Sequence, residues 1–319
     1  MLTYLVKRLL ALLPTALVPV VMVFVIIRLA PGDPAAQILG DQATPEQVAA
    51  LRHQLGLDAA LLAQFGAFLR KLVTLDLGDS LFLHEPVRDL IPGYAAVTLE
   101  IGLLSLALST VGGMAIGMVA AFRRGRPDGR IASAVGIIGI SIPQFWFGLL
   151  LVVVFAVQVR AFPVSGYRTW SEGVGPHLQA IFLPALTLAL AQLGIVSRMV
   201  SSSIVDVLHE PFVTTARSLG VRPARIRTAH VMRVVSVEIL TIMGLLLATV
   251  LSGSVVVENI FGIPGMGRLL FDAVGRRDYD VIQGVVLFVG IFIIVVNLAV
   301  DVLYAVVDPR VRYGKAADR

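Results

Sequence analysis

Six long runs of sequence without a charged residue constrain this chain more than any other feature. Each run is 19 to 29 residues long, and about 20 apolar helical residues are enough to cross the hydrocarbon core of a bilayer. They do not show the period-two alternation of a transmembrane strand. The runs therefore predict an all-α integral membrane protein with six transmembrane helices. They are 9–27, 101–122, 131–159, 173–197 (spanning from about 178), 239–257 and 281–300.

The overall composition excludes a soluble fold. Hydrophobic residues make up 57% of the 319 residues and charged residues 15%, against about 25% charged residues in a typical soluble domain. The chain has no cysteine, which excludes disulfides, thiolate metal sites and cysteine nucleophiles. No Ser-His-Asp constellation can be argued either, and we expect no catalytic residue and no enzyme activity in this chain by itself. Four scattered histidines, without metal-ligand spacing, also predict no metal site: His84, His177, His209 and His230.

The first run is predicted to be a retained helix within residues 1–30 and not a cleaved signal peptide. It follows the basic residues Lys7 and Arg8, as a signal core would. Its 19 residues exceed the roughly 7–15 of a signal core, and no small-x-small cleavage site follows it cleanly.

The distribution of lysine and arginine predicts the orientation in the membrane. Sixteen of the 26 basic residues fall in the N-terminal tail, the loops after the second and fourth runs, and the C-terminal tail. Because basic loops stay in the cytoplasm, both termini are expected there, with 308–319 as a cytoplasmic tail.

Residues 31–93 are predicted to form a small α-rich subdomain on the outer side. Thr44 and Gln47 have the spacing of a capping box at a helix start, and Gly56 ends that helix. A second amphipathic helix is expected over about 59–75. Its apolar face would hold Leu62, Phe65, Leu69 and Leu72.

Small residues recur at every fourth position on the second and fifth runs. Such stripes let helix backbones approach closely, and a seam that moves during function is the alternative interpretation. The stripes are Ser105, Ser109, Gly113 and Gly117, and Gly244, Ala248 and Ser252.

A basic segment, 210–230, interrupts the apolar pattern between the fourth and fifth runs. Pro211 suits a first helical turn and Gly220 suits a left-handed helix end, so a helix of about nine residues is expected between them. Pro223 then opens a second helix that leads into the fifth run. The segment is predicted to be helix, glycine turn and helix.

Two interpretations fit this loop. Phe212, Ala216 and Leu219 would form an apolar stripe flanked by arginines. The stripe suits an interfacial helix whose arginines meet lipid phosphates. It also suits a short docking helix that lies in the groove of a cytoplasmic partner.

Distinctive strings run along the whole chain. They are LAPGDPA (29–35), ATPEQVAALRHQLGLD (43–58), SIPQFWFGLLLV (141–152), FPVSGY (162–167) and LPALTLAL (183–190), then PFVTTARSLG, VVVENIFGIPGMGRLL, RDYDVIQGVVL and VNLAVDVLYAVVDPRVRY. Together they resemble the permease subunit of bacterial ABC importers of the dipeptide, oligopeptide and nickel class. The resemblance implies a type I ABC importer permease-like bundle in a bacterial inner membrane. Residues 94–307 would form its five-helix core, with a cytoplasmic coupling loop at 201–233.

The resemblance also implies a role for the basic loop. Permeases of this kind carry a cytoplasmic motif, Glu-Ala-Ala with a later glycine, that lies in a cleft of an ATPase subunit. Thr214, Thr215, Ala216 and Gly220 occupy these positions, and the acidic residue is absent. The coupling residues expected from the resemblance are Phe212, Thr214, Thr215, Ala216, Arg217, Leu219 and Gly220.

The energy source is expected on another chain, because no G-x-x-x-x-G-K-[ST] phosphate-binding loop occurs. The resemblance implies no cofactor in this chain, with ATP and Mg²⁺ held by two ABC ATPase subunits. The other implied partners are a homologous second permease, an extracytoplasmic substrate-binding protein and the lipid bilayer, but no nucleic acid. Di- or oligopeptides are the implied cargo, and nickel, glutathione or another small solute is the alternative. A secondary transporter without an ATPase is a more distant alternative.

Polar groups inside the runs are candidates for the translocation path. Asn297 and Asp301 lie one turn apart, although Asp301 could instead pair with Arg198 or Arg233. Pro143 is expected in the middle of the third helix, where it would cause a kink. The path candidates are Ser141, Gln144, Gln192, Asn297 and Asp301.

Three glutamates lie near the ends of runs. Glu100 is expected to reach interfacial water, and Glu238 and Glu258 are expected to be boundary residues on either side of the fifth run.

Overall fold

The computed structural model describes residues 14–25, 34–39, 43–54 and 56–307, and almost all of them are helical. No strand occurs in these ranges beyond an isolated bridge between Asp79 and Pro86. The prediction of an all-α fold is confirmed. After a first helix, Pro14–Val25, come α2 (Pro34–Leu39), α3 (Pro45–Gln54), α4 (Leu61–Val73), α5 (Val87–Phe122), α6 (Pro127–Ser141), α7 (Gln144–Leu151), η1 (Val152–Gln158), η2 (Trp170–Glu172), α8 (Val174–Leu208), α9 (Pro211–Ser218), α10 (Pro223–Arg225), η3 (Ile226–Val231), α11 (Met232–Phe261), α12 (Met266–Arg276) and α13 (Tyr279–Val307).

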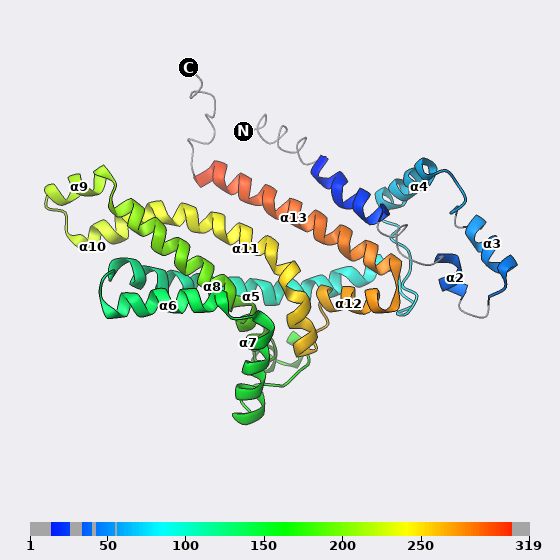
Figure 1. The fold of residues 1–319 in the computed structure, drawn as a ribbon, viewed down its shortest axis with the longest axis horizontal. Coiled ribbons are helices and arrows are strands. Elements are labelled where there is room, and N and C mark those ends of the chain that lie inside the picture. Colours follow the sequence, from blue (N-terminus) through cyan, green and yellow to red (C-terminus); the bar gives the residue numbers. More distant parts are fainter. Residues whose placement is uncertain (1–13, 26–33, 40–42, 55, 308–319) are drawn as a thin grey trace, which may run out of the picture. The chain divides into compact units, whose positions relative to one another are not determined.

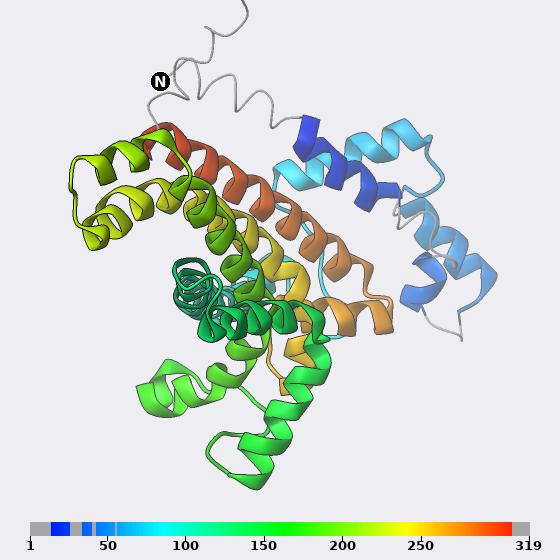
Figure 2. The same cartoon turned by 60° about the vertical axis from the view of Figure 1, so that its left-hand side comes forward.

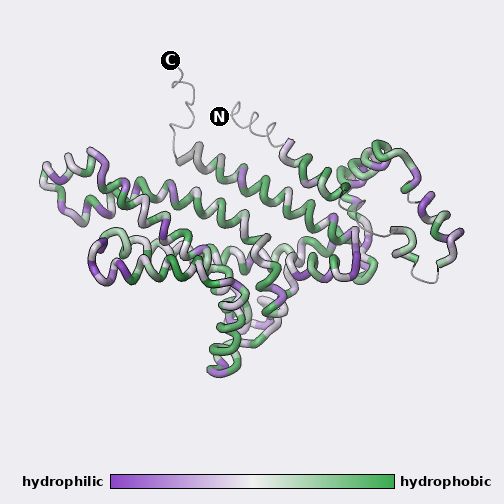
Figure 3. Tube along the Cα trace, viewed as in Figure 1, coloured by the Kyte–Doolittle hydropathy of each residue, from purple (hydrophilic) through white to green (hydrophobic). Residues whose placement is uncertain are grey.

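Four helices are long and apolar enough to cross a membrane, and two bent helix pairs could raise this number to six. The four contain the second and sixth predicted runs and most of the fourth and fifth, and the pair α6 with α7 and η1 contains nearly all of the third. The first predicted run, 9–27, lies partly outside the described residues, which give an apolar helix Pro14–Val25. Figure 3 shows hydrophobic residues along the long helices and hydrophilic ones around α9 and α10. The four long apolar helices are Val87–Phe122, Val174–Leu208, Pro223–Leu251 and Tyr279–Val300.

The third predicted span bends at Pro143 as expected, but the expectation that the helix continues through Pro143 is wrong, because the helix is broken there. α6 ends at Ser141, and α7 begins at Gln144 with a bend of 102° between the two halves. Ile142 and Pro143 have ψ angles of 127°. The residue before a proline is driven out of the α region, so the helix stops before the proline and restarts after it.

The chain divides into two compact units. Among the described residues, unit 1 comprises 95–268 and 295–307, and unit 2 comprises 14–25, 34–39, 43–54, 56–94 and 269–294. α5, α12 and α13 contribute residues to both units. The boundaries predicted from the sequence stay predictions.

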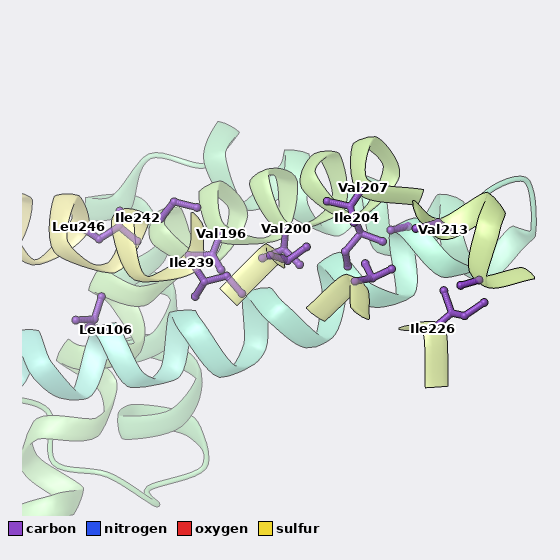
Figure 4. Close-up of a cluster of buried hydrophobic side chains, with 14 residues drawn as sticks. Leu106, Val196, Val200, Ile204, Val207, Val213, Ile226, Ile239, Ile242 and Leu246 are labelled. Carbon is purple, nitrogen blue, oxygen red and sulfur yellow. The ribbon is translucent and has the colours of Figure 1, made fainter. Parts of the chain in front are cut away.

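The core of unit 1 joins α5, α8, α9, η3 and α11. In unit 1, α8 lies between α6 and α11 and packs against both, and α9 and α10 lie at one end (Figures 1 and 2). A cluster of buried aliphatic side chains fills the space between these helices (Figure 4). Its members include Leu106, Val196, Val200, Ile204, Val207, Val213, Ile226, Ile239, Ile242 and Leu246.

The small residues of α5 face α8. A Cβ added to Gly117 would lie 2.6 Å from the carbonyl oxygen of Ser197, and Ser105 and Ser109 both donate hydrogen bonds to Gln192 on α8. The small residues therefore let α5 and α8 pack closely, as expected if the stripe serves helix packing.

Unit 2 packs the first helix against α4. Phe24 meets Phe65 edge to face with ring centroids 5.0 Å apart. Val20, Val23 and Leu287 form the buried centre of this cluster, which also takes in Phe68, Leu69 and Leu72. Leu62 was expected on the same face but is 85% exposed, because the packed stretch of α4 begins one turn later.

Two further sets of hydrogen bonds lie in unit 2, and the sequence predicted one of them. The capping box at the start of α3 is confirmed, since the Thr44 N–H donates to Gln47 and the Gln47 N–H donates to the Thr44 hydroxyl. Asp278, which the sequence did not single out, is buried and accepts hydrogen bonds from the Ser80 hydroxyl and the Leu81 N–H. It ties the segment before α5 to the start of α13.

Candidate functional site

The loop between α8 and α11 has the helix–glycine–helix form that the sequence predicted. Pro211 occupies the first turn of α9, and Gly220 has the left-handed φ of +73°. The Gly220 N–H donates to the Arg217 carbonyl at 3.0 Å and the Val221 N–H to the Ala216 carbonyl at 3.1 Å. These two bonds form a Schellman motif, so α9 ends in a defined turn.

The second helix of the loop continues directly into a membrane span. α10 begins at Pro223, passes through the π-helical η3 and becomes α11, so that Pro223–Leu251 forms a single apolar span. The loop is therefore attached to α8 on one side and to α11 on the other.

The buried face of α9 differs from the predicted stripe. Val213 has no exposed surface and Ala216 is 9% exposed, and both belong to the core cluster with Val207 and Ile226. In Figure 4 Val213 lies between α8 and Ile226. The prediction that Phe212, Ala216 and Leu219 form one exposed stripe is wrong, because Ala216 packs into the protein. Val213 and Ala216, three residues apart, together anchor α9 to unit 1.

The side of α9 next to this buried face is exposed. Phe212 is 40% exposed and Leu219 is 77% exposed, and with exposed Thr215 they have the spacing i, i+3, i+7 of one helix face. We call Phe212, Thr215 and Leu219 the free face of α9. It offers two large apolar side chains on a short, firmly anchored helix.

Positive charge surrounds the free face. Arg217, Arg222 and Arg225 are exposed, and none of them forms an ion pair with another described residue. Arg227 lies over the ring of Phe122 at 5.3 Å, where its charge meets the negative face of the ring. Thr214, predicted as a coupling residue, is exposed on the side of α9 away from Val213 and Ala216.

Among the path candidates, Gln192 has the most defined environment. It is buried on α8, and its Oε1 accepts hydrogen bonds from Ser105 and Ser109 of α5 at 3.2 and 3.1 Å. This is a polar cluster within an apolar bundle, where such interhelical bonds stabilise packing by about 0.6 kcal/mol each.

The other path candidates are not joined to it. Ser141 is exposed and donates to the Ile137 carbonyl, and Gln144 begins α7 after the break. Asn297 is exposed on α13. Asp301 lies one turn further along α13, and its side chain is outside what the structure describes, so its proposed pairing with Arg198 or Arg233 stays a prediction.

Two glutamates occupy places that sequence reasoning missed. Glu258, expected at a boundary, is 1% exposed and accepts hydrogen bonds from the Thr98 hydroxyl and the Arg268 N–H. Glu100, expected in interfacial water, accepts from the Tyr167 hydroxyl and pairs with His177, both at 2.8 Å. The only sequence feature that could have indicated the burial of Glu258 is the set of glycines in GIPGMG, which follows it.

The apolar spans and this loop define a class of protein: a multi-pass helical membrane protein with a helix–turn–helix loop between two of its spans. The sequence matches the family of binding-protein-dependent transport system inner membrane components over residues 113–313, and its N-terminal family over 1–81. The chain belongs to this family, and the resemblance inferred from the sequence is confirmed.

Relatives similar over nearly the whole chain narrow the class to ABC importer permeases of the peptide type. A Brucella abortus (strain 2308) protein named as a peptide transport system permease is 38% identical over 307 residues, covering 96% of this chain and 98% of that protein. The glutathione transport system permease protein GsiC of Salmonella typhimurium (strain LT2) is 40% identical over 313 residues, covering 98% of this chain and all of GsiC.

A solved structure shows the same fold. A chain of the MetNI methionine ABC transporter, in an inward-facing conformation, matches with a TM-score of 0.54 at 19% identity. The match covers 69% of this chain and 96% of that chain. The prediction of a type I ABC importer permease fold is confirmed.

Proposed function

We propose that this chain forms half of the translocation path of an ATP-driven importer of short peptides. The named cargoes of its relatives support this class, because glutathione is itself a tripeptide. Di- and oligopeptides are the first choice and glutathione is the alternative, and competition between them for uptake by the reconstituted importer distinguishes the two.

The free face of α9 is the observation that carries the proposed mechanism. A short helix with large apolar residues at i and i+7 of one face, Phe212 and Leu219, suits insertion into a groove of a partner, and the exposed arginines of the loop suit an acidic rim. The partner would be an ABC ATPase subunit, which would hold ATP and Mg²⁺. The coupling residues are Phe212, Thr214, Thr215, Ala216, Arg217, Leu219 and Gly220.

The anchoring of α9 supports its role as a lever. Val213 and Ala216 pack into the same cluster as residues of α8 and α11, and interiors of proteins are close-packed and transmit strain. A force applied to the free face would therefore reach both helices. Closure of the ATPases around ATP would move the loops of this chain and of a second permease, and the path would open toward a binding protein outside.

The test is purification of the whole importer with a charge on the free face. Phe212→Asp is expected to weaken retention of the ATPase subunits by about 30-fold or more, as for loss of an aromatic hot spot. Ser218→Asp is the matched control, because Ser218 is exposed on α9 but outside the free face. Normal retention and uptake in Phe212→Asp would overturn the coupling role.

A further inference from the structure

Glu258 is a buried carboxylate that the proposed coupling does not use. It lies near the end of α11 with 1% of its surface exposed. A carboxylate buried in an apolar helix bundle is unfavourable unless its hydrogen bonds are made. Its partners are the Thr98 hydroxyl of α5 at 2.6 Å and the N–H of Arg268 in the first turn of α12 at 2.9 Å.

These bonds belong to a chain of donors and acceptors. The Met266 N–H donates to the Thr98 hydroxyl oxygen at 2.8 Å, and the Thr98 O–H donates to Glu258 Oε1. The Arg268 N–H donates to Glu258 Oε2. Only a group with two acceptor oxygens completes this set, because an amide in the same place must turn an NH₂ toward a donor or leave the Thr98 hydrogen without an acceptor.

The turn between α11 and α12 is shaped around the carboxylate. A Cβ on Gly265 would overlap the Glu258 carboxyl group, and one on Gly267 would lie 2.5 Å from the Val255 Cα. Both positions therefore need glycine for close approach. The turn folds over Glu258 and holds the start of α12 against the end of α11.

Glu258 is also connected to the coupling loop through a continuous helix. From Pro223 the chain is helical through η3 and α11 to Phe261, a path on the order of 50 Å to Glu258 at 1.5 Å per residue. Along this path, Val235, Ile239 and Ile242 pack in the core cluster of unit 1.

We propose that Glu258 is a positioning residue for transport, which makes the end of α11, Thr98 of α5 and the first turn of α12 move as one body. Displacement of the coupling loop would then reach all three together. The inference rests on the proposed coupling function, and it assigns the far end of α11 as the place where that displacement acts. Without the carboxylate, α11 would still move but the turn would not follow it.

The first experiment uses the complete importer, reconstituted in lipid vesicles with its own ATPase subunits and binding protein. The amount of cargo taken up per ATP hydrolysed is expected to fall about 10-fold in Glu258→Gln and in Thr98→Val. A fall of this size corresponds to the loss of one hydrogen bond to a charged group. Thr98→Ser keeps the hydroxyl and is expected to restore the normal ratio. ATPase subunits are retained in all three variants, whereas they are lost in Phe212→Asp if the proposed function holds.

The second experiment reports on the turn itself. The chain has no cysteine, so Pro264→Cys, exposed within the turn, can carry a single nitroxide spin label. Its spectrum is expected to show an immobile label in the parent and in Thr98→Ser, and a mobile one in Glu258→Gln and Thr98→Val.

Either of two results overturns the proposal. One is an unchanged uptake ratio in Glu258→Gln together with an immobile label. The other is a mobile label with an unchanged ratio, which would make the bonds structural only. If Glu258→Gln fails to assemble, Thr98→Val decides alone, and a normal ratio in that variant overturns the proposal.

Discussion

His177 shows how one buried residue can organise a loop of this protein. Both ring nitrogens face acceptors: Nδ1 lies 2.6 Å from the Arg168 carbonyl oxygen and Nε2 lies 2.8 Å from Glu100 Oε1. The ring therefore lies between one acceptor in the loop before α8 and one on α5. Trp170 stacks on the ring with a centroid distance of 3.9 Å. His177 thereby ties the loop before α8 to α5.

Replacing His177 is expected to loosen this loop. His177→Ala removes the hydrogen bond between His177 and Glu100 and is expected to lower the stability by about 2 kcal/mol, a typical loss for a hydrogen bond to a carboxylate. Thermal unfolding of the purified protein in detergent measures this, with His209→Ala as the control, since His209 is exposed and its ring bonds to the Val205 carbonyl one turn earlier. Equal midpoints for the two variants would contradict the pairing.

Tyr167 gives the same cluster a defined pH dependence. Burial, and then the hydrogen bond and charge of Glu100, raise the pKa of Tyr167 from 10.0 to about 12. The protonated phenol is favoured in the folded protein, so its contribution is complete below about pH 10 and is lost as pH rises through about 12. The stability difference between the parent and Tyr167→Phe is expected to be constant from neutral pH to about pH 10 and to shrink above it. A difference that already changes near neutral pH would show that another group is responsible.

At the scale of elements, sequence punctuation predicted α9 better than the hydrophobic pattern did. Pro211 and Gly220 marked its two ends correctly. The pattern failed because Phe212 and Val213 are adjacent apolar residues, and eight residues are too few to show which stripe is buried. Packing against α8 and η3 decides for Val213, a choice that depends on residues far away in the sequence.

Gly220 can be tested apart from steric contacts. Nothing lies within 4 Å of a Cβ added at this position, and its φ is +73°, so Gly220→Ala introduces backbone strain alone. We expect a loss of about 1 kcal/mol in stability and a partial loss of ATPase retention, because α9 would end less sharply. Gly220→Asn is expected to lie between the parent and Gly220→Ala, since asparagine tolerates the left-handed region better. Thermal unfolding and copurification measure both effects, and identical values for alanine and glycine would contradict the role of the turn.

At the scale of the whole molecule, hydropathy predicted the spans because each one is a local property of the chain. Four of the six runs lie in long apolar helices, and one more, the third run, lies in the broken pair α6 with α7 and η1. Hydrogen bonds between residues far apart in the sequence could not be predicted from hydropathy. Glu258 ended a charge-free run and was therefore interpreted as a boundary residue, but its partner Thr98 lies 160 positions earlier. Only the folded chain shows that the two meet.

The orientation of the chain is the last prediction, and it follows from the same distribution of charge. The basic loop around α9 is expected in the cytoplasm, which places the loop between η1 and α8 outside. The cysteine-free chain allows Ser218→Cys and Ser165→Cys, both exposed, to be compared in intact cells. A membrane-impermeant maleimide that has access to the outer face is expected to label Ser165→Cys at once and Ser218→Cys only after the cells are lysed. The reverse pattern would place α9 outside, where no ATP-hydrolysing partner could reach the free face.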